Sequence, residues 1–216
     1  LRLRLGKSLA KHASHSGSSI QSAGKLVEQR GEPFTRESDP AGFPALAERA
    51  EVALNHLADQ LKAVTPDVVL VIGDDQGELF SPDNFPAIAV YRGAELVMKP
   101  SQHLEGMPPW ADTKFWSGYR MDFPHRYPGA PELANELVTG LIREGVDVTS
   151  CANVSDPTKR GFGHAFGFII ERLMKEVQVP MLPVMLNTYF PPNTPTAARC
   201  RAVGEKIGKI LKASSS

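Results

Sequence analysis

Apolar residues follow two different spacings along the chain, and their alternation predicts an α/β protein. Recurrence at three and four residues is typical of amphipathic helices and predicts them at 46–61, 131–144, 165–177 and 196–212. Short continuous apolar runs predict strands at 68–72, 86–91, 146–148 and 181–186. Strands that are apolar on both faces need a sheet that is covered on both sides. We therefore expect a three-layer αβα sandwich around a mixed, mostly parallel sheet.

Two stretches depart from this alternation. Residues 1–43 show little apolar periodicity, which predicts an N-terminal arm or an incomplete segment ahead of an α/β domain at 44–216. Residues 99–130 begin with few β-forming residues and continue with an aromatic-rich stretch, which predicts a long excursion or lid rather than sheet. The chain opens without a methionine and closes on serines directly after a predicted helix, so we expect the domain to be truncated at both ends.

Composition narrows the classes of function. The 24 acidic and 24 basic residues balance, which argues against binding to nucleic acid or to an anionic membrane. No apolar run approaches the roughly 18 residues that a membrane span needs. The two cysteines form neither a disulfide framework nor a metal knuckle, which predicts a reducing, cytoplasmic setting. The sequence also contains no phosphate-binding glycine motif and no hydrolase nucleophile elbow.

The segment Gly-Phe-Gly-His-Ala-Phe-Gly-Phe at 161–168 is the first candidate for chemistry. Its glycines allow a ligand to approach the backbone closely, and its phenylalanines are suited to wall a site for a flat apolar substrate. A helix start keeps a histidine neutral and proton-accepting, because the helix dipole disfavours added positive charge. These features predict that His164 is a general base. The alternative interpretation, a structural histidine at a helix start, is the more frequent case.

Polar clusters follow three of the predicted strands, at 73–78, 156–164 and 187–189. Ligands of α/β sheets gather at the carboxyl ends of strands, so we expect these clusters to converge around one hollow. The acidic cluster at 73–78 has two interpretations. Its carboxylates suit a hard metal such as iron, manganese or magnesium. They also suit a plain acidic turn.

Taken together, these stretches resemble the class III extradiol ring-cleavage dioxygenases of the protocatechuate 4,5-dioxygenase catalytic-subunit type. The resemblance covers residues 45–212, and its most specific parts are the last two motifs and their order. The matching stretches are 66–80, 86–90, Gly-His-Ala-Phe at 163–166, Pro-Val-Met-Leu-Asn-Thr-Tyr at 183–189, and 195–204.

The resemblance implies a non-haem Fe(II) enzyme that binds a catechol, uses dioxygen as co-substrate and cleaves the ring outside the diol. In that family two histidines and a glutamate hold the metal, and a further histidine, matched here by His164, acts as acid and base. The candidate substrate-binding residues are Phe166, Asn187 and Tyr189.

The chain departs from the family at the metal. Gln76 stands where the family has its second metal histidine, and the nearby Glu78 is a candidate replacement ligand. His15 is the candidate for the first metal histidine, although the residues before it do not resemble the family's strand. The metal glutamate is expected beyond residue 212.

Three functions therefore stay open. The first is an extradiol dioxygenase acting on a catechol. If the catechol bears a carboxylate, the candidates to bind that group are Arg92, Lys159 and Arg160. The second is a non-catalytic binding or partner subunit of the same fold. The third is a metal-dependent hydrolase that uses the carboxylates of 74–78. We expect a homo-oligomer, with a dimer favoured.

Overall fold

The computed structural model describes residues 28–29, 40–100 and 115–214. His15 and residues 101–114 lie outside this part of the chain, as does most of the predicted arm. Contacts divide the chain into two units, Leu1–Ala53 and Leu54–Ser216. The predicted division after residue 43 stays a prediction.

The first unit contributes a short 3-10 helix, η2 (Pro40–Gly42), and the start of helix α4 (Phe43–Val64). Helix α4 confirms the helix predicted at 46–61. It ends just before Thr65 and Pro66, where the sequence predicts a stop because the residue before proline avoids helical geometry.

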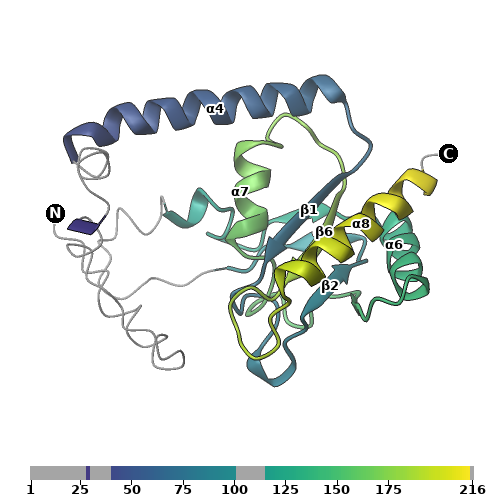
Figure 1. The fold of residues 1–216 in the computed structure, drawn as a ribbon. Helices are drawn as coiled ribbons and strands as arrows, with labels where there is room; N and C mark the ends of the chain where they lie inside the picture. Colours follow the sequence, from purple (N-terminus) through teal and green to yellow (C-terminus); the bar gives the residue numbers. More distant parts are fainter. Residues whose placement is uncertain (1–27, 30–39, 101–114, 215–216) are drawn as a thin grey trace. The chain divides into compact units, whose positions relative to one another are not determined.

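A four-stranded mixed sheet forms the centre of the second unit (Figure 1). Its strand order is β1 (Val69–Asp74), β6 (Met181–Leu186), β2 (Ile88–Tyr91) and β5 (Thr149–Cys151). The pairs β1–β6 and β2–β5 are parallel, and β2–β6 is antiparallel. Two of the three pairings are thus parallel, which confirms the mixed sheet that the sequence predicts.

Helices cover both faces of this sheet, as a three-layer sandwich requires. Helices α6 (Pro131–Arg143) and α8 (Ala197–Ser214) lie on one side of the strands, and α7 (His164–Arg172) lies on the other (Figure 1). Alternate residues of each central strand enter opposite hydrophobic clusters, as the two-residue period of a strand demands. The α6 and α8 side receives Ile88, Val90, Leu182 and Val184. The α7 side receives Ala89, Tyr91, Met181 and Met185.

Strand β5 begins three residues later than the strand predicted at 146–148. Residue Val146 instead completes the C-terminus of α6, where its N–H bonds to the carbonyl of Leu141 at 2.9 Å. Gly145 has φ of 74° and bonds to the carbonyl of Ile142, which together make a Schellman cap. The apolar run therefore belongs to a helix end, and Val146 is buried there rather than paired in the sheet.

A second, two-stranded sheet joins β3 (Glu95–Val97) to β4 (Arg126–Pro128) in antiparallel register. The prediction that 99–130 contains no sheet is therefore wrong for 126–128. Strand β4 is only three residues long and ends in proline, so it carries no apolar alternation that sequence could register.

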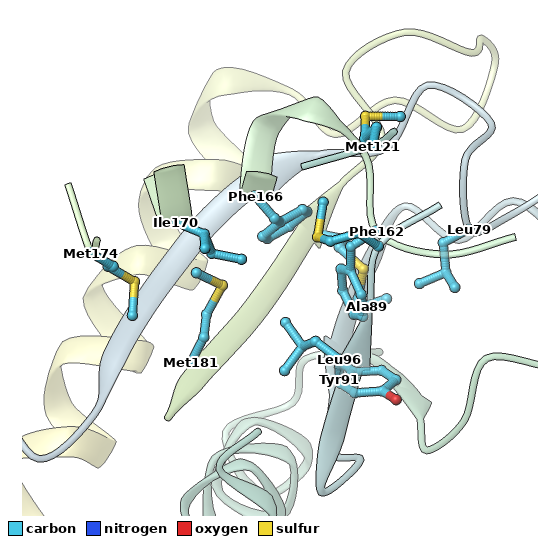
Figure 2. Packing of buried hydrophobic residues seen from close by; sticks show 12 residues of the cluster. Leu79, Ala89, Tyr91, Leu96, Met121, Phe162, Phe166, Ile170, Met174 and Met181 are labelled. Carbon is cyan, nitrogen blue, oxygen red and sulfur yellow. The ribbon is translucent and has the colours of Figure 1, made fainter. Parts of the chain in front are cut away.

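Helix α7 is held by the cluster on its side of the sheet. Phe166 and Ile170 reach from α7 into this cluster, beside Met181 (Figure 2). The helix ends at Arg172, earlier than the predicted residue 177, but Met174 and Val177 stay buried because the following turns keep them over the core.

Among the described residues, none of the helices combines the length and the apolar character that a membrane crossing requires.

Candidate active site

His164 is the first residue of α7 and follows directly on Gly163. The helix behind it is anchored by Phe166 and Ile170, which are 1% and 5% exposed. A side chain at the start of such a helix has a fixed origin, because the backbone beneath it cannot shift without disturbing the core. The helix start predicted at 165 is confirmed to within one residue.

Glu78 contacts His164 directly. The Nδ1 atom of His164 lies 3.0 Å from Oε1 of Glu78, across 86 residues of sequence. The second carboxylate oxygen, Oε2, accepts the backbone N–H of Gln76 at 2.5 Å. Glu78 is buried, whereas the His164 side chain is 38% exposed. Among the described residues, the hydrogen bond of the His164 ring is made by Nδ1, and the partly exposed side chain lines a cavity.

The absence of a side chain at Gly163 makes this contact possible. A Cβ atom at Gly163 would lie 2.5 Å from the carboxyl carbon of Glu78. The same logic applies one helical turn later, where a Cβ at Gly167 would lie 1.8 Å from the carbonyl oxygen of Tyr119. The glycines of 161–168 therefore admit neighbouring protein segments, rather than the ligand that the sequence suggested.

The carboxylate sets the protonation of the histidine. The hydrogen bond to Glu78 raises the pKa of His164 above its ordinary value, against an opposing effect of burial. Burial by itself disfavours the ionised Glu78, but hydrogen bonds from His164, Asp75 and the Gln76 amide outweigh it and lower the pKa of Glu78. The pair is thus stabilised as imidazolium and carboxylate.

This direction is opposite to the one predicted from the helix terminus. The N-terminus of a helix carries only about half an elementary charge, spread over several N–H groups. Glu78 brings a full charge to hydrogen-bond distance of the ring. The nearer and larger charge decides the sign.

Asp75 builds the turn that presents Glu78. Its Oδ1 accepts the backbone N–H groups of Glu78 and Leu79 at 2.9 Å each, and its Oδ2 accepts that of Phe80 at 2.8 Å. The side chain is 3% exposed, and burial raises the pKa of Asp75 to about 6 although the backbone amides oppose the rise. Asp75 therefore has a structural part in the acidic cluster.

A cavity of about 380 Å³ opens beside the His164–Glu78 pair. Its size lies in the range of small-molecule sites. Polar groups come from Gln76, Glu78, Lys99 and His164, and the remaining lining is Phe115, Trp116, Tyr119 and Met121. These four residues belong to the stretch 99–130 that the sequence predicts as a long excursion or lid.

The aromatic wall is organised around His164. The rings of Tyr119 and His164 meet edge to face, with centroids 5.9 Å apart. Phe115 packs edge to face on both Trp116 and Tyr119, at 4.8 and 5.2 Å. Such a wall is suited to a flat ring, because aromatic pairs prefer offset or edge-to-face contacts.

The other predicted site residues lie elsewhere. Phe166 packs in the core, where its ring lies against Gly73. Asn187 is 1% exposed and organises the loop after β6, since it donates to the carbonyls of Phe190 and Asn193 and accepts two backbone N–H groups. Tyr189 is exposed and packs on Phe190. None of the three lines the cavity beside His164, and their binding roles stay predictions.

Gln76 lines the cavity, and its side chain is hydrogen-bonded to a neighbouring carboxylate. Its Nε2 donates to Oδ2 of Asp74 at 3.0 Å, and the same oxygen accepts the hydroxyl of Thr188 at 3.4 Å. The polar clusters after β1 and β6 thus meet, as expected for clusters at strand ends, because the two strands are parallel. The cluster at 156–164 joins them through His164.

The described residues do not by themselves form the predicted iron site. No group of three His, Cys, Asp or Glu side chains within the described ranges is arranged to hold a metal ion. The oxygens of Asp75 and Glu78 already accept hydrogen bonds within the protein. His15, the predicted first ligand, lies outside this part of the chain.

No known protein-family profile matches the chain. One curated relative is the 2,3-dihydroxyphenylpropionate/2,3-dihydroxicinnamic acid 1,2-dioxygenase of Mycobacterium sp. (strain MCS), at 30% identity over 153 residues. The match covers 69% of this chain and 42% of that relative, so the chain spans less than half of the relative's length. A distant relative of this chain is therefore a dioxygenase.

Two solved structures to which this chain is weakly similar are nucleosidases. One is a protein from Weissella paramesenteroides assigned as a methylthioadenosine nucleosidase, with a TM-score of 0.41 at 12% identity. The match covers 73% of this chain and 72% of that protein's chain. The AMP nucleosidase of Bacteroides thetaiotaomicron has a TM-score of 0.40 at 12% identity, with 76% and 71% covered.

Proposed function

We propose that this chain provides the acid–base group and the ring-binding wall of an extradiol dioxygenase that cleaves a catechol. The observation that carries the proposal is the His164–Glu78 pair, which lines an aromatic-walled cavity of about 380 Å³. The 30% identity to a dioxygenase supports the same reaction class.

His164 is the proposed acid and base. Its Nδ1 is engaged by Glu78, so Nε2 is the atom that accepts a proton from a substrate hydroxyl and returns it later. Glu78 orients the ring and stabilises the imidazolium that forms, as a carboxylate behind a catalytic histidine does. Because the pKa of His164 is raised, the basic form is reached only above the ordinary histidine range, and activity should rise with pH there.

Fe(II), with dioxygen as co-substrate, stays part of the proposal on the strength of the family resemblance. The metal in such enzymes activates dioxygen and binds the diol. The described side chains do not complete its site, so its ligands would include residues outside them, His15 among the candidates.

Removal of the imidazole tests the proposal. The purified protein is supplied with Fe(II) without oxygen, then mixed with catechols in air, while ring-opened product is followed by its yellow absorbance and by oxygen uptake. We expect His164→Ala to lower kcat on the order of 100-fold or more, the usual range for loss of a general acid or base. His56→Ala, which removes an exposed histidine of α4, is the matched control and should leave kcat unchanged. Full activity in His164→Ala would refute the assigned role.

A non-catalytic binding or partner subunit of the same fold is the second candidate. It is favoured by the engaged oxygens of Asp75 and Glu78 and by the lack of a three-ligand metal group among the described side chains. Metal analysis of natively purified protein separates the two candidates. Stoichiometric iron argues for the enzyme, whereas metal-free protein that binds catechol without turnover argues for the partner subunit.

The hydrolase interpretation loses support, because Asp75 gives both oxygens to three backbone amides and Glu78 faces His164. Activity without oxygen would revive it.

We also propose a homo-oligomer, a dimer in the first instance, which light scattering of the purified chain will test.

A further inference from the structure

We propose that the open edge of β1 is the docking surface for a second copy of this chain, which adds its own β1 as an antiparallel strand. The inference does not depend on the proposed reaction. It rests on the proposed homo-oligomer and names the surface that joins two of its subunits.

The backbone of β1 carries free hydrogen-bonding groups along its outer side. The N–H of Val69 donates to the carbonyl of Pro180 at 2.9 Å, and β1 pairs with β6 along its whole length. In such a parallel ladder alternate residues bond to the same neighbour, so Leu70 and Ile72 present their N–H and C=O groups away from β6. Within the described part of the chain, β1 pairs with no strand other than β6.

The side chains of β1 are apolar on both faces of the sheet but incompletely covered. Val69 and Val71 pack on the α7 side, and Leu70 packs on the side of α6 and α8. None of the six residues of β1 is buried, whereas all four residues of the central strand β2 are. Ile72 is 52% exposed. A strand with two apolar faces normally lies inside a sheet, between two neighbouring strands.

The two edges of the sheet differ in their protection against further pairing. At the opposite edge, β5 is only three residues long, and the hydroxyl of its exposed Ser150 accepts a hydrogen bond from Nε of Arg92 at 2.7 Å. Short and polar edge strands discourage the addition of another strand. In contrast, β1 is six residues long, has no lysine, proline or bulge, and carries its only charge at its last residue, Asp74. The open edge of β1 thus lacks these protections.

The chemistry of this edge selects its occupant. A strand that covers β1 must itself be apolar on both faces, because β1 presents Leu70 and Ile72 on one face and Val71 on the other. Among the described strands, β1, β2 and β6 meet this condition, but β2 and β6 already have a neighbour on each side. The apolar strand that is free to pair is therefore β1 itself, and a second copy supplies it. Pairing of identical surfaces closes about a two-fold axis.

Hydrogen bonding and charge set the register. With Val71 on the two-fold axis, antiparallel pairing places Leu70 opposite Ile72 of the partner subunit, and the outward N–H and C=O groups of these residues bond to one another. The same register places Asp74 opposite Val68 of the partner subunit. A parallel pairing in register would instead place two Asp74 carboxylates side by side, and like charges directly opposite are destabilising. The antiparallel arrangement is therefore favoured, and it joins two four-stranded sheets into one.

The size of this contact sets the expected strength of the dimer. Six residues of strand extend about 20 Å. Pairing along one such edge covers less than the roughly 1,200 Å² at which stable interfaces begin. We therefore expect a reversible dimer that dissociates on dilution.

A charge on the open edge tests the proposal. Ile72→Lys places a lysine on the edge, which is a common natural device against strand addition. Ile142→Lys is the matched control, because Ile142 lies on α6 and is 59% exposed. Sedimentation of the full chain is followed over a dilution series from about 100 μM to about 1 μM. We expect Ile72→Lys to weaken dimerisation about tenfold or more, and Ile142→Lys to match the parent.

Amide hydrogen exchange reads the same edge without a substitution. The amides of Leu70 and Ile72 should be protected in the dimer and should exchange faster as the parent protein is diluted. Circular dichroism of Ile72→Lys should match that of the parent, because the side chain at this position is exposed. A matching spectrum separates loss of pairing from loss of folding.

Each contrary result has a distinct meaning. Dimers of Ile72→Lys as tight as those of the parent would overturn the role of the β1 edge and leave the homo-oligomer standing. Equal loss in Ile72→Lys and Ile142→Lys would overturn it too. A parent that is monomeric at about 100 μM would overturn both, and protected Leu70 and Ile72 amides in that monomer would show that another segment of the same chain covers the edge. Turnover of catechols is measured separately, so the proposed reaction stands or falls without these results.

Discussion

The ends of β1 and β6 make an informative comparison, because the two parallel strands deliver two polar clusters to one edge of the sheet. After β1, Glu78 turns toward a distant segment and meets His164 at 3.0 Å. After β6, Asn187 turns inward and binds its own loop at Phe190 and Asn193. Strand register brings polar residues to the same edge, but the partner of each side chain decides whether it faces a cavity or holds a loop.

Removal of Asp75 should have the largest effect on stability. Asp75→Ala leaves three backbone N–H groups without their acceptor, and each buried unsatisfied group costs about 1–3 kcal/mol. We expect a loss of at least about 3 kcal/mol in the free energy of unfolding, measured by urea denaturation. Asp83→Ala, which removes an exposed acid from η3 (Pro82–Asn84), should change it by less than about 0.5 kcal/mol. Equal stability of the two variants would show that Asp75 does not build the turn.

Asn187→Ala should have the next largest effect. It removes two donated and two accepted hydrogen bonds from the loop after β6, some of them replaceable by water, so we expect a loss of about 2 kcal/mol. If the loop role is the whole role, KM for a catechol stays unchanged at temperatures where the variant is folded. A raised KM would instead support the predicted contact between Asn187 and the substrate.

The His164–Glu78 pair should give a smaller, pH-dependent stabilisation. A raised histidine pKa contributes stability below about 6.5 that is lost as pH rises through the folded value. A lowered glutamate pKa contributes stability above about 4.5 that is lost as pH falls through the folded value. Both contributions are therefore present together between those limits.

Glu78→Gln isolates this contribution. The difference in unfolding free energy between the parent and the variant should be greatest near pH 5–6 and should shrink toward pH 9. We expect no more than about 1 kcal/mol, because the His164 ring is partly open to solvent. A difference that does not vary with pH would contradict the pairing.

Gln76→Ala should have the smallest effect. The side chain is exposed and makes one hydrogen bond, to Asp74, so we expect a change within about 0.5 kcal/mol. A much larger loss, measured by the same denaturation, would show that the turn depends on its surface contacts rather than on Asp75.

Sequence predicted the fold where apolar patterns were long. The apolar runs at 68–72 and 181–186 and the stripes of α4, α6 and α8 appear close to their predicted positions. The failures have local causes. Val146 belongs to the Schellman cap of α6, and β4 is too short to show alternation.

The candidate site was predictable only in part. The glycine-rich helix start identified His164, and the strand-end rule identified Glu78, but no local pattern indicates that the two meet across 86 residues. Lys99 was missed because it lies at the start of a stretch that lacks β-forming residues. The available signal was the apolar run at 96–98 just before it, which is the same strand-end pattern that marked 73–78.

The most direct test of the central claim is the titration of the His164 ring by NMR in the parent protein and in Glu78→Gln. The measurement needs neither iron nor turnover. We expect the pKa of His164 to lie above the ordinary 6.5 in the parent and to be clearly lower once the carboxylate is neutralised. The same pKa in both proteins would contradict the claim that Glu78 holds and tunes the histidine.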